Sequence, residues 1–104
     1  MNRGDVVDVE LPELGRRQAE IVTRDVAIEF LANVTVASIT TRIRGLPTEV
    51  FVDREQGLDD DCVVICDNLF TLPKAAVVRV RGELGPDQRH QLDSALATAL
   101  GIDY

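Results

Sequence analysis

The chain has 104 residues, of which 45% are apolar, so we expect one folded domain over residues 1–104 rather than a disordered chain. Its formal net charge of −7 argues against a generic nucleic-acid coat protein, which is usually basic. No apolar run approaches the roughly 20 residues that cross a bilayer, and no leader pattern opens the chain, so we expect a cytoplasmic protein without a membrane contact.

Several short segments have the composition and alternation of strands with one face in a core. The expected strands cover residues 4–11, 16–23, 34–43, 48–53, 62–66 and 74–83. Between them, we expect turns at residues 12–15, 54–61 and 67–73, and a loop with a short helical turn at residues 25–31.

The C-terminal segment has the spacing of an amphipathic helix. Pro86 suits the first helical turn because it needs no N–H partner there, and Asp87 complements the helix dipole. One apolar stripe follows, and Gly101 can end the helix; the stripe consists of Leu92, Ala95, Leu96, Ala99 and Leu100. Short strands followed by one such helix predict an α+β, mostly β fold, in which a small antiparallel barrel packs against the helix.

Three groups of residues could in principle bind a metal, and each is explained without one. Cys62 and Cys66 share one face of a β-branched strand, so we expect small buried side chains, and the other ligands of a zinc site are missing from the sequence. Residues 59–61 are acidic, but a cation site needs ligands from more than one segment, so we expect a solvated loop. His90 lies outside the apolar stripe and should be exposed. We therefore predict no metal and no cofactor.

Residues 16–44 of this acidic chain contain five arginines. Residues 38–44 place hydroxyls beside the alternating Arg42 and Arg44. Guanidinium groups bind phosphate well because their forks match its oxygens. A polar strand end at a solvated barrel rim explains the same residues, and Arg79 and Arg81 are likewise explained by an outward strand face or by phosphate contacts. These patterns alone leave both interpretations open.

Five short motifs follow one another along nearly the whole chain. They are Arg3-Gly4-Asp5-Val6, Gly15-Arg16-Arg17 with residues 21–25, residues 36–41 with 46–50, residues 63–68 with Thr71-Leu72, and residues 93–96 with 100–102. Each motif is weak by itself, but in this order they resemble the MazF/PemK (Kid) toxin family. The resemblance implies an SH3-like barrel of the CcdB/MazF type, a homodimer, and the toxin of a type II toxin–antitoxin system.

The resemblance further implies a sequence-specific, metal-independent endoribonuclease. Such a toxin cleaves single-stranded RNA, chiefly mRNA, to inhibit translation and growth, and a cognate MazE-like antitoxin neutralises it. The RNA 2′-hydroxyl attacks the adjacent phosphate, which gives a 2′,3′-cyclic phosphate and a 5′-hydroxyl. By the same resemblance, the expected RNA-binding residues are Arg16, Thr41, Arg42, Arg44, Asn68 and Lys74.

The catalytic residues that the resemblance implies are Arg17, Thr40 and Asp67. Arg17 would chiefly stabilise the charge that develops on the phosphorane, because preorganised donors aimed at such charge lower the barrier strongly. Thr40 would donate a hydrogen bond to a phosphate oxygen. Asp67 would accept the 2′-hydroxyl proton or orient Arg17.

Four positions depart from the family pattern. Gln18 and Ser38 stand where the family has proline, and Phe70 stands where it has arginine. Glu20 interrupts an apolar strand, so it must reach the rim, pair with an arginine such as Arg17, or cost several kcal/mol as a buried unpaired charge. These departures leave two alternatives, a CcdB-like toxin that binds DNA gyrase and a catalytically degenerate binding module of the same fold.

Overall fold

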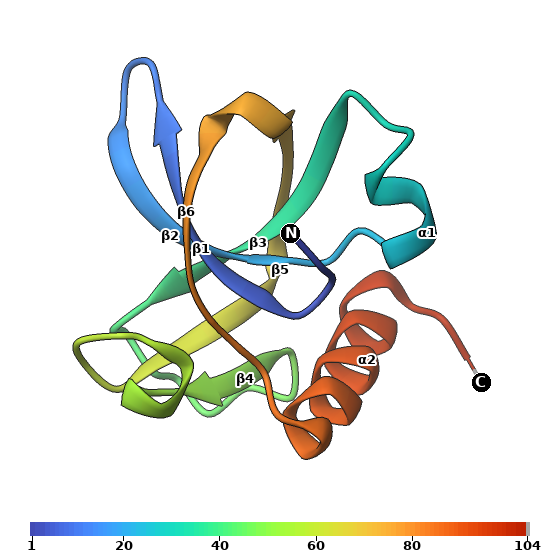
Figure 1. Ribbon diagram of the computed structural model, residues 1–104. Helices are drawn as coiled ribbons and strands as arrows, with labels where there is room; N and C mark the ends of the chain where they lie inside the picture. Colours follow the sequence, from blue (N-terminus) through green and yellow to red (C-terminus); the bar gives the residue numbers. More distant parts are fainter. Residues whose placement is uncertain (104) are drawn as a thin grey trace.

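The computed structural model describes residues 1–103 and contains one antiparallel sheet of six strands in the order β4-β5-β3-β2-β1-β6. The sheet curls into a half-barrel, and the C-terminal helix α2 packs against its lower half (Figure 1). The strands are β1 (Asp5–Leu11), β2 (Gly15–Ile21), β3 (Asn33–Thr40), β4 (Glu49–Val52), β5 (Cys62–Pro73) and β6 (Val77–Glu83). The helices are α1 (Asp25–Ile28), α2 (Pro86–Leu100) and two 3-10 turns, η1 (Arg54–Gln56) and η2 (Lys74–Ala76). The predicted mostly β fold with a C-terminal helix is confirmed.

Strand β5 is much longer than its sequence suggests. It runs from Cys62 to Pro73, so the turn predicted at residues 67–73 is wrong. Asp67 and Asn68 are accommodated in a bulge, because Ser38 of β3 pairs with Ile65 while the preceding Ala37 pairs with Leu69. Residues 66–68 therefore lie opposite no residue of β3, and bulges of this kind bend a strand and redirect its side chains.

Strand β3 is shorter than predicted, because it ends at Thr40 rather than at residue 43. The loop that follows, residues 41–48, is organised by Glu49, whose Oε1 accepts hydrogen bonds from three successive N–H groups at 3.0, 2.9 and 3.4 Å. Arg42 and Arg44 consequently lie on an exposed loop and not on a strand. Strand β6 also begins later than predicted, because residues 74–76 form η2.

Two apolar clusters form the core, one on each face of the curled sheet. Adjacent residues of β1 belong to different clusters, since Val6 packs in the first and Val7 in the second. The first cluster includes Leu92, Ala95 and Leu96 of α2, as the predicted stripe requires. The last residue of that stripe, Leu100, is 58% exposed and lies outside the core.

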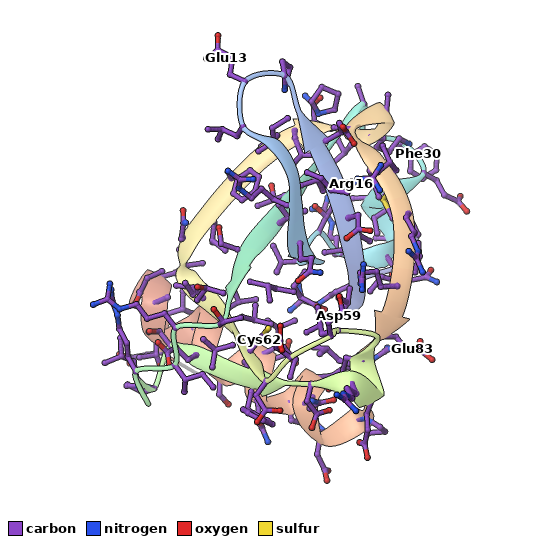
Figure 2. All side chains as sticks on the ribbon, turned by 90° about the vertical axis from the view of Figure 1, so that its left-hand side faces the viewer. Glu13, Arg16, Phe30, Asp59, Cys62 and Glu83 are labelled. Atoms are coloured by element: carbon purple, nitrogen blue, oxygen red, sulfur yellow. The ribbon has the colours of Figure 1, made fainter. Side chains whose placement is uncertain are left out.

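The expected burial of the two cysteines and the expected exposure of the acidic loop and of His90 are confirmed. Cys62 and Cys66 are buried and unbridged in the first cluster, and burial raises the pKa of the Cys66 thiol to about 11. Residues 59–61 and His90 are exposed. Figure 2 shows Cys62 and Asp59 in the lower half of the molecule, far from Glu13 at the tip of the β1–β2 hairpin. Among the described residues, no helix has the length and apolar character needed to span a membrane.

Candidate functional site

The candidate site lies where β2 and β3 separate. Their pairing is confined to residues 19–21 and 36–38, and beyond it the β1–β2 hairpin and the end of β3 diverge (Figure 1). Ala19 of β2 is paired with Ser38 of β3, and Arg17 and Thr40 each lie two residues beyond this pair, on the diverging ends of their strands. Because paired residues and residues two apart share a face, Arg17, Ser38 and Thr40 belong to the same face of the sheet.

Arginines of two strands line a cleft of about 360 Å³ beside this gap. We call it the basic cleft; its lining residues are Asp8, Arg16, Arg17, Gln18, Ile39, Arg79 and Arg81. Four guanidinium groups face one carboxylate here, although the whole chain is acidic. A concentration of one sign of charge in a cleft attracts anions such as phosphate.

Two of these arginines are held by carboxylates. Arg81 Nη1 lies 3.3 Å from Oδ2 of the buried Asp8, and its Nε donates to the Gly57 carbonyl at 2.8 Å. Arg16, labelled in Figure 2, lies 3.2 Å from the Glu10 carboxylate on the hairpin. These two guanidinium groups are therefore partly neutralised.

The other two arginines keep their charge available. Arg17 is exposed and donates to the Arg16 carbonyl at 3.0 Å, and within residues 1–103 no carboxylate pairs with it. Arg79 is also exposed and forms no ion pair in the same part of the chain. A phosphate that enters the basic cleft thus meets two guanidinium groups that need not break an existing ion pair.

A second cleft, of about 450 Å³, shares part of its wall with the first. We call it the Phe70 cleft; its lining residues are Leu11, Leu14, Arg17, Gln18, Ser38, Ile39, Asn68 and Phe70. Arg17, Gln18 and Ile39 line both clefts. Arg17 therefore lies at the boundary between a strongly basic cleft and a largely apolar one.

The bulge of β5 sends its two polar side chains to different partners. Asn68 Nδ2 donates to Ser38 Oγ at 2.8 Å inside the Phe70 cleft. Asp67 Oδ2 accepts a hydrogen bond of 2.6 Å from Thr48 Oγ1, just before β4. Asp67 lines neither cleft, so the structure places it beside the site through its neighbour Asn68 and not inside a cleft.

The remaining expected RNA-contacting residues fall into two places. Thr40 is half-buried at the end of β3, accepts a hydrogen bond from the Arg42 N–H at 3.2 Å and lines neither cleft. Thr41, Arg42 and Arg44 follow it on the exposed loop. Lys74 is separated from them, because it follows the opposite end of the β3–β5 ladder, and eight residues of strand extend over roughly 23 Å. Its Nζ donates to the Ile28 carbonyl at 2.7 Å.

Of the possibilities that the sequence leaves for Glu20, the structure shows a buried side chain and no pairing with Arg17. Glu20 pairs with Ala37 on the opposite face of the sheet, it is completely buried, and neither carboxyl oxygen has a hydrogen-bond partner within residues 1–103. Desolvation by burial, with a smaller contribution from Asp5, raises the pKa of Glu20 to about 10. The carboxyl is therefore protonated at neutral pH and forms no ion pair with Arg17.

Sequence reasoning missed several residues that line the two clefts. Phe70 and Ser38 were recognised only as departures from a pattern, and Leu11, Leu14 and Asp8 were assigned to strands or loops without a role. The signal that identifies them is strand register, since Phe70 pairs with Val36 two residues from Ser38 and both share the face of Arg17. That register depends on the bulge, which the sequence alone did not predict.

Comparison with known proteins agrees with this architecture. Residues 2–100 match the family model described as PemK-like, MazF-like toxin of type II toxin–antitoxin system. Endoribonuclease MazF3 of Mycobacterium tuberculosis (strain H37Rv) is 44% identical over 88 residues, which is 85% of each chain. Probable endoribonuclease MazF2 of the same strain is 32% identical over 102 residues, covering 97% of this chain and 99% of that protein.

Solved structures give the same result. Mycobacterium tuberculosis toxin MazF-mt6 matches with a TM-score of 0.88 and 40% identity, over 96% of this chain and 99% of that one. An endoribonuclease from Mycobacterial species, in complex with its cognate antitoxin, matches with a TM-score of 0.88 and 31% identity over 100% and 98% of the two chains. The half-barrel with its C-terminal helix is thus the architecture of a class of small toxins. The chain belongs to the PemK/MazF family of type II toxin–antitoxin systems.

Proposed function

We propose that this PemK/MazF toxin is an endoribonuclease that cuts single-stranded RNA, chiefly mRNA, at the gap between β2 and β3. The observation that carries the proposal is the position of Arg17, which lines both clefts without a carboxylate partner among the described residues. The relatives that share this fold are named endoribonucleases. Cleavage of cellular RNA would take place in the cytoplasm and would stop translation and growth.

The chemistry requires no group beyond those of the protein, the RNA and water. The 2′-oxygen loses its proton and forms a bond to the adjacent phosphorus while the bond from phosphorus to the 5′-oxygen breaks. The 5′-oxygen takes up a proton from water, which yields a 2′,3′-cyclic phosphate and a 5′-hydroxyl. Negative charge accumulates on the non-bridging oxygens in between. The Arg17 guanidinium stabilises that charge, and a single preorganised donor of this type contributes about 10²- to 10³-fold in rate.

Thr40 and Asp67 complete the proposed reaction. The Thr40 oxygen already accepts the Arg42 N–H, so its own O–H is free to donate to a phosphate oxygen. Asp67 is exposed and oriented by Thr48, which suits a carboxylate that accepts the 2′-hydroxyl proton. A positioned general base of this kind typically contributes about 10²- to 10⁴-fold.

The RNA strand would extend from the basic cleft across the gap to the loop after β3. Arg16 and Arg79 contact phosphates in the cleft, Asn68 contacts the nucleotide at the bulge, and Arg42 and Arg44 contact phosphates at the loop. Thr41 lies on the same loop. Lys74, at the far end of the β3–β5 ladder, can contact only a distant part of a longer strand. Binding through these few arginines should weaken steeply with salt.

The proposed partners follow from the same charge distribution. A MazE-like antitoxin with an acidic, extended tail would occupy the basic cleft and exclude RNA. The related mycobacterial endoribonuclease was solved in complex with its cognate antitoxin. We also expect a homodimer. The gyrase-binding alternative is not favoured, because the similar proteins are named endoribonucleases.

One incubation tests the proposal. The purified protein and the Arg17→Ala variant are each mixed with a long single-stranded RNA in EDTA, and the products are mapped and their ends identified. We expect discrete cuts with 2′,3′-cyclic phosphate ends from the parent and none from the variant. Absence of cutting by a folded parent, or equal cutting by the variant, would contradict the proposal.

A further inference from the structure

The loop that joins the end of β3 to the edge strand β4 depends on few contacts for its shape (Figure 1). Residues 41–47 are exposed and form neither helix nor strand. In the described part of the chain, hydrogen bonds tie this stretch to only two residues outside it, Thr40 and Glu49. Thr40 accepts one N–H, that of Arg42, at 3.2 Å. The rest of the loop is therefore held by Glu49.

Glu49 binds the loop through both its side chain and its backbone. Its Oε1 accepts the N–H groups of Arg44, Gly45 and Leu46, and its own N–H donates to the Leu46 carbonyl at 3.0 Å. Gly45 has a φ of +71°, and a left-handed residue in such a run allows successive N–H groups to converge on one anion. Hydrogen bonds to an ionised carboxylate are stronger than neutral ones, so this contact fixes the backbone of the loop.

The carboxylate that holds the loop belongs to the rigid part of the fold. Glu49 is the first residue of β4 and pairs with Ile65 of β5, and the next residue, Val50, is 1% exposed in the first cluster. The loop is thus attached to the sheet through one side chain whose backbone cannot move freely.

The residues that the loop presents to solvent are cationic. Arg42 and Arg44 are exposed, and within residues 1–103 neither forms an ion pair. Side chains and loops that must become ordered when a ligand binds lower its affinity, and a loop that is already ordered avoids part of this cost. The contact with Glu49 therefore bears on how tightly these two arginines bind an anion.

We propose that Glu49 is a positioning residue for RNA binding, because it holds the loop in the shape that presents Arg42 and Arg44 to the RNA phosphates. The inference rests on the proposed function, since it takes RNA as the ligand. The Glu49 carboxylate is also a negative charge near this loop, and its direct electrostatic effect on RNA opposes binding. Positioning and repulsion thus predict effects of opposite sign, and three N–H groups offset the charge of the carboxylate.

The test separates the charge of Glu49 from its reach. The probe is a long single-stranded RNA of mixed sequence with 2′-O-methyl riboses, which lacks the attacking hydroxyl, and dissociation constants are measured by fluorescence anisotropy. Glu49→Gln keeps an acceptor oxygen at the same reach without the charge, whereas Glu49→Asp keeps the charge on a shorter side chain. Asp53→Ala is the matched control, because the Asp53 carboxylate also accepts a backbone N–H, that of Glu55 at 3.0 Å, but in η1.

We expect Glu49→Ala and Glu49→Asp each to weaken RNA binding by about 5-fold or more, since ordering two long side chains on binding costs at least about that much. Glu49→Gln should bind within about 3-fold of the parent, because it retains an acceptor for the loop. Asp53→Ala should bind as the parent does. Melting curves show whether each variant is folded, and Glu49→Asp keeps the test valid if Glu49→Ala does not fold.

Two further measurements distinguish positioning from a general loss of structure. In a chain that already carries Arg42→Ala and Arg44→Ala, Glu49→Ala should change binding by less than about 2-fold, because no arginine is left to position. In cleavage of unmodified RNA, Glu49→Ala should raise KM and leave kcat near that of the parent. The Cys66 N–H still holds the Thr48 carbonyl at 2.9 Å, so the residue that orients Asp67 keeps its place.

Tighter binding by both Glu49→Gln and Glu49→Ala would overturn the inference, because repulsion would then be the main effect of Glu49. Equal weakening in Glu49→Ala and Asp53→Ala, or an undiminished loss in the chain without the two arginines, would also overturn it. A folded parent that binds no RNA would contradict both this inference and the proposed function. A parent that binds RNA with the expected dependence on Glu49 but cuts none would contradict the proposed function alone.

Discussion

The Thr48 hydroxyl donates a hydrogen bond of 2.6 Å to Asp67 Oδ2, and this bond joins the loop before β4 to the bulge of β5. Thr48 is 8% exposed while Asp67 is exposed, so a buried group orients a carboxylate that remains accessible to RNA. The bond gives Asp67 a defined position, which a general base requires.

This relationship predicts different effects for two conservative changes. Asp67→Asn keeps the shape and an acceptor for Thr48 but cannot take a proton, so cleavage should slow by about 10²-fold or more. Thr48→Val removes only the orienting bond and should cost less. Single-turnover cleavage of one mapped RNA measures both. Asp67→Asn cleaving at the parental rate would exclude the carboxylate as the base.

Glu20 predicts an unusual dependence of stability on pH. Its pKa is about 10 in the folded state against 4.5 in the unfolded state, so the folded chain retains a proton that the unfolded chain loses. The contribution of this protonation to the free energy of unfolding is complete below pH 4.5. It is lost as the pH rises toward 10, by roughly 1.4 kcal/mol per pH unit. Glu20→Gln removes this proton exchange.

The stability of Glu20→Gln relative to the parent should therefore grow with pH. Urea denaturation at pH 5, 7 and 9 measures the free energy of unfolding of both proteins, and the difference should increase by roughly 3 kcal/mol for every two pH units. A difference that stays constant over this range would mean that Glu20 is ionised in the folded state.

The Asp8–Arg81 pair predicts a large loss of stability. The Asp8 side chain is 3% exposed and the Arg81 side chain 14%, so Asp8→Ala leaves a mostly buried guanidinium without its closest carboxylate. We expect a loss of about 3 kcal/mol in the free energy of unfolding. Glu10→Ala, which breaks the exposed pair with Arg16, should cost less than about 1 kcal/mol. Equal losses in chemical denaturation would contradict this ranking.

Gly57 follows η1 and lies against the backbone of β6, with no room for a side chain. Its φ is +86°, and a Cβ there would lie 2.3 Å from the Arg81 carbonyl oxygen, which is backbone and cannot move aside cheaply. Gly57→Ala should therefore destabilise by at least about 3 kcal/mol, as strain and overpacking combine. Gly15→Ala has a similar φ of +73° but open space around it, so strain alone should cost about 1 kcal/mol. Thermal unfolding of both variants tests the difference.

Most strands of this chain could be predicted from the alternation of apolar and polar residues. The site could not, because it depends on how the strands pair and on the bulge of β5. Residues 67–73 have turn-like composition, yet the neighbouring β3 supplies pairing partners and turns them into the second half of β5. The bulge at residues 66–68 then decides which polar side chain enters the Phe70 cleft. Such tertiary pairing outweighs local propensity in sheets.

Glu20 illustrates a second limit of prediction from the sequence. Glu20 lies on the same strand as Arg17, β2, and an odd number of residues along a strand places two side chains on opposite faces. Strand geometry therefore excludes a salt bridge between them. What the sequence could not show is that the packing on that face buries Glu20 completely. By contrast, the position of Arg17 on the second strand agrees with the family resemblance.

The central claim is that the Arg17 guanidinium stabilises the charge on the reacting phosphate. The most direct measurement is the single-turnover rate of one mapped cut by the parent, Arg17→Ala, Arg17→Lys and the control Arg24→Ala, whose exposed arginine lines a different groove. We predict a loss of at least about 10²-fold for Arg17→Ala, a smaller loss for Arg17→Lys, and the parental rate for Arg24→Ala. Parental rates from a folded Arg17→Ala, or equal losses in Arg17→Ala and Arg24→Ala, would contradict the account.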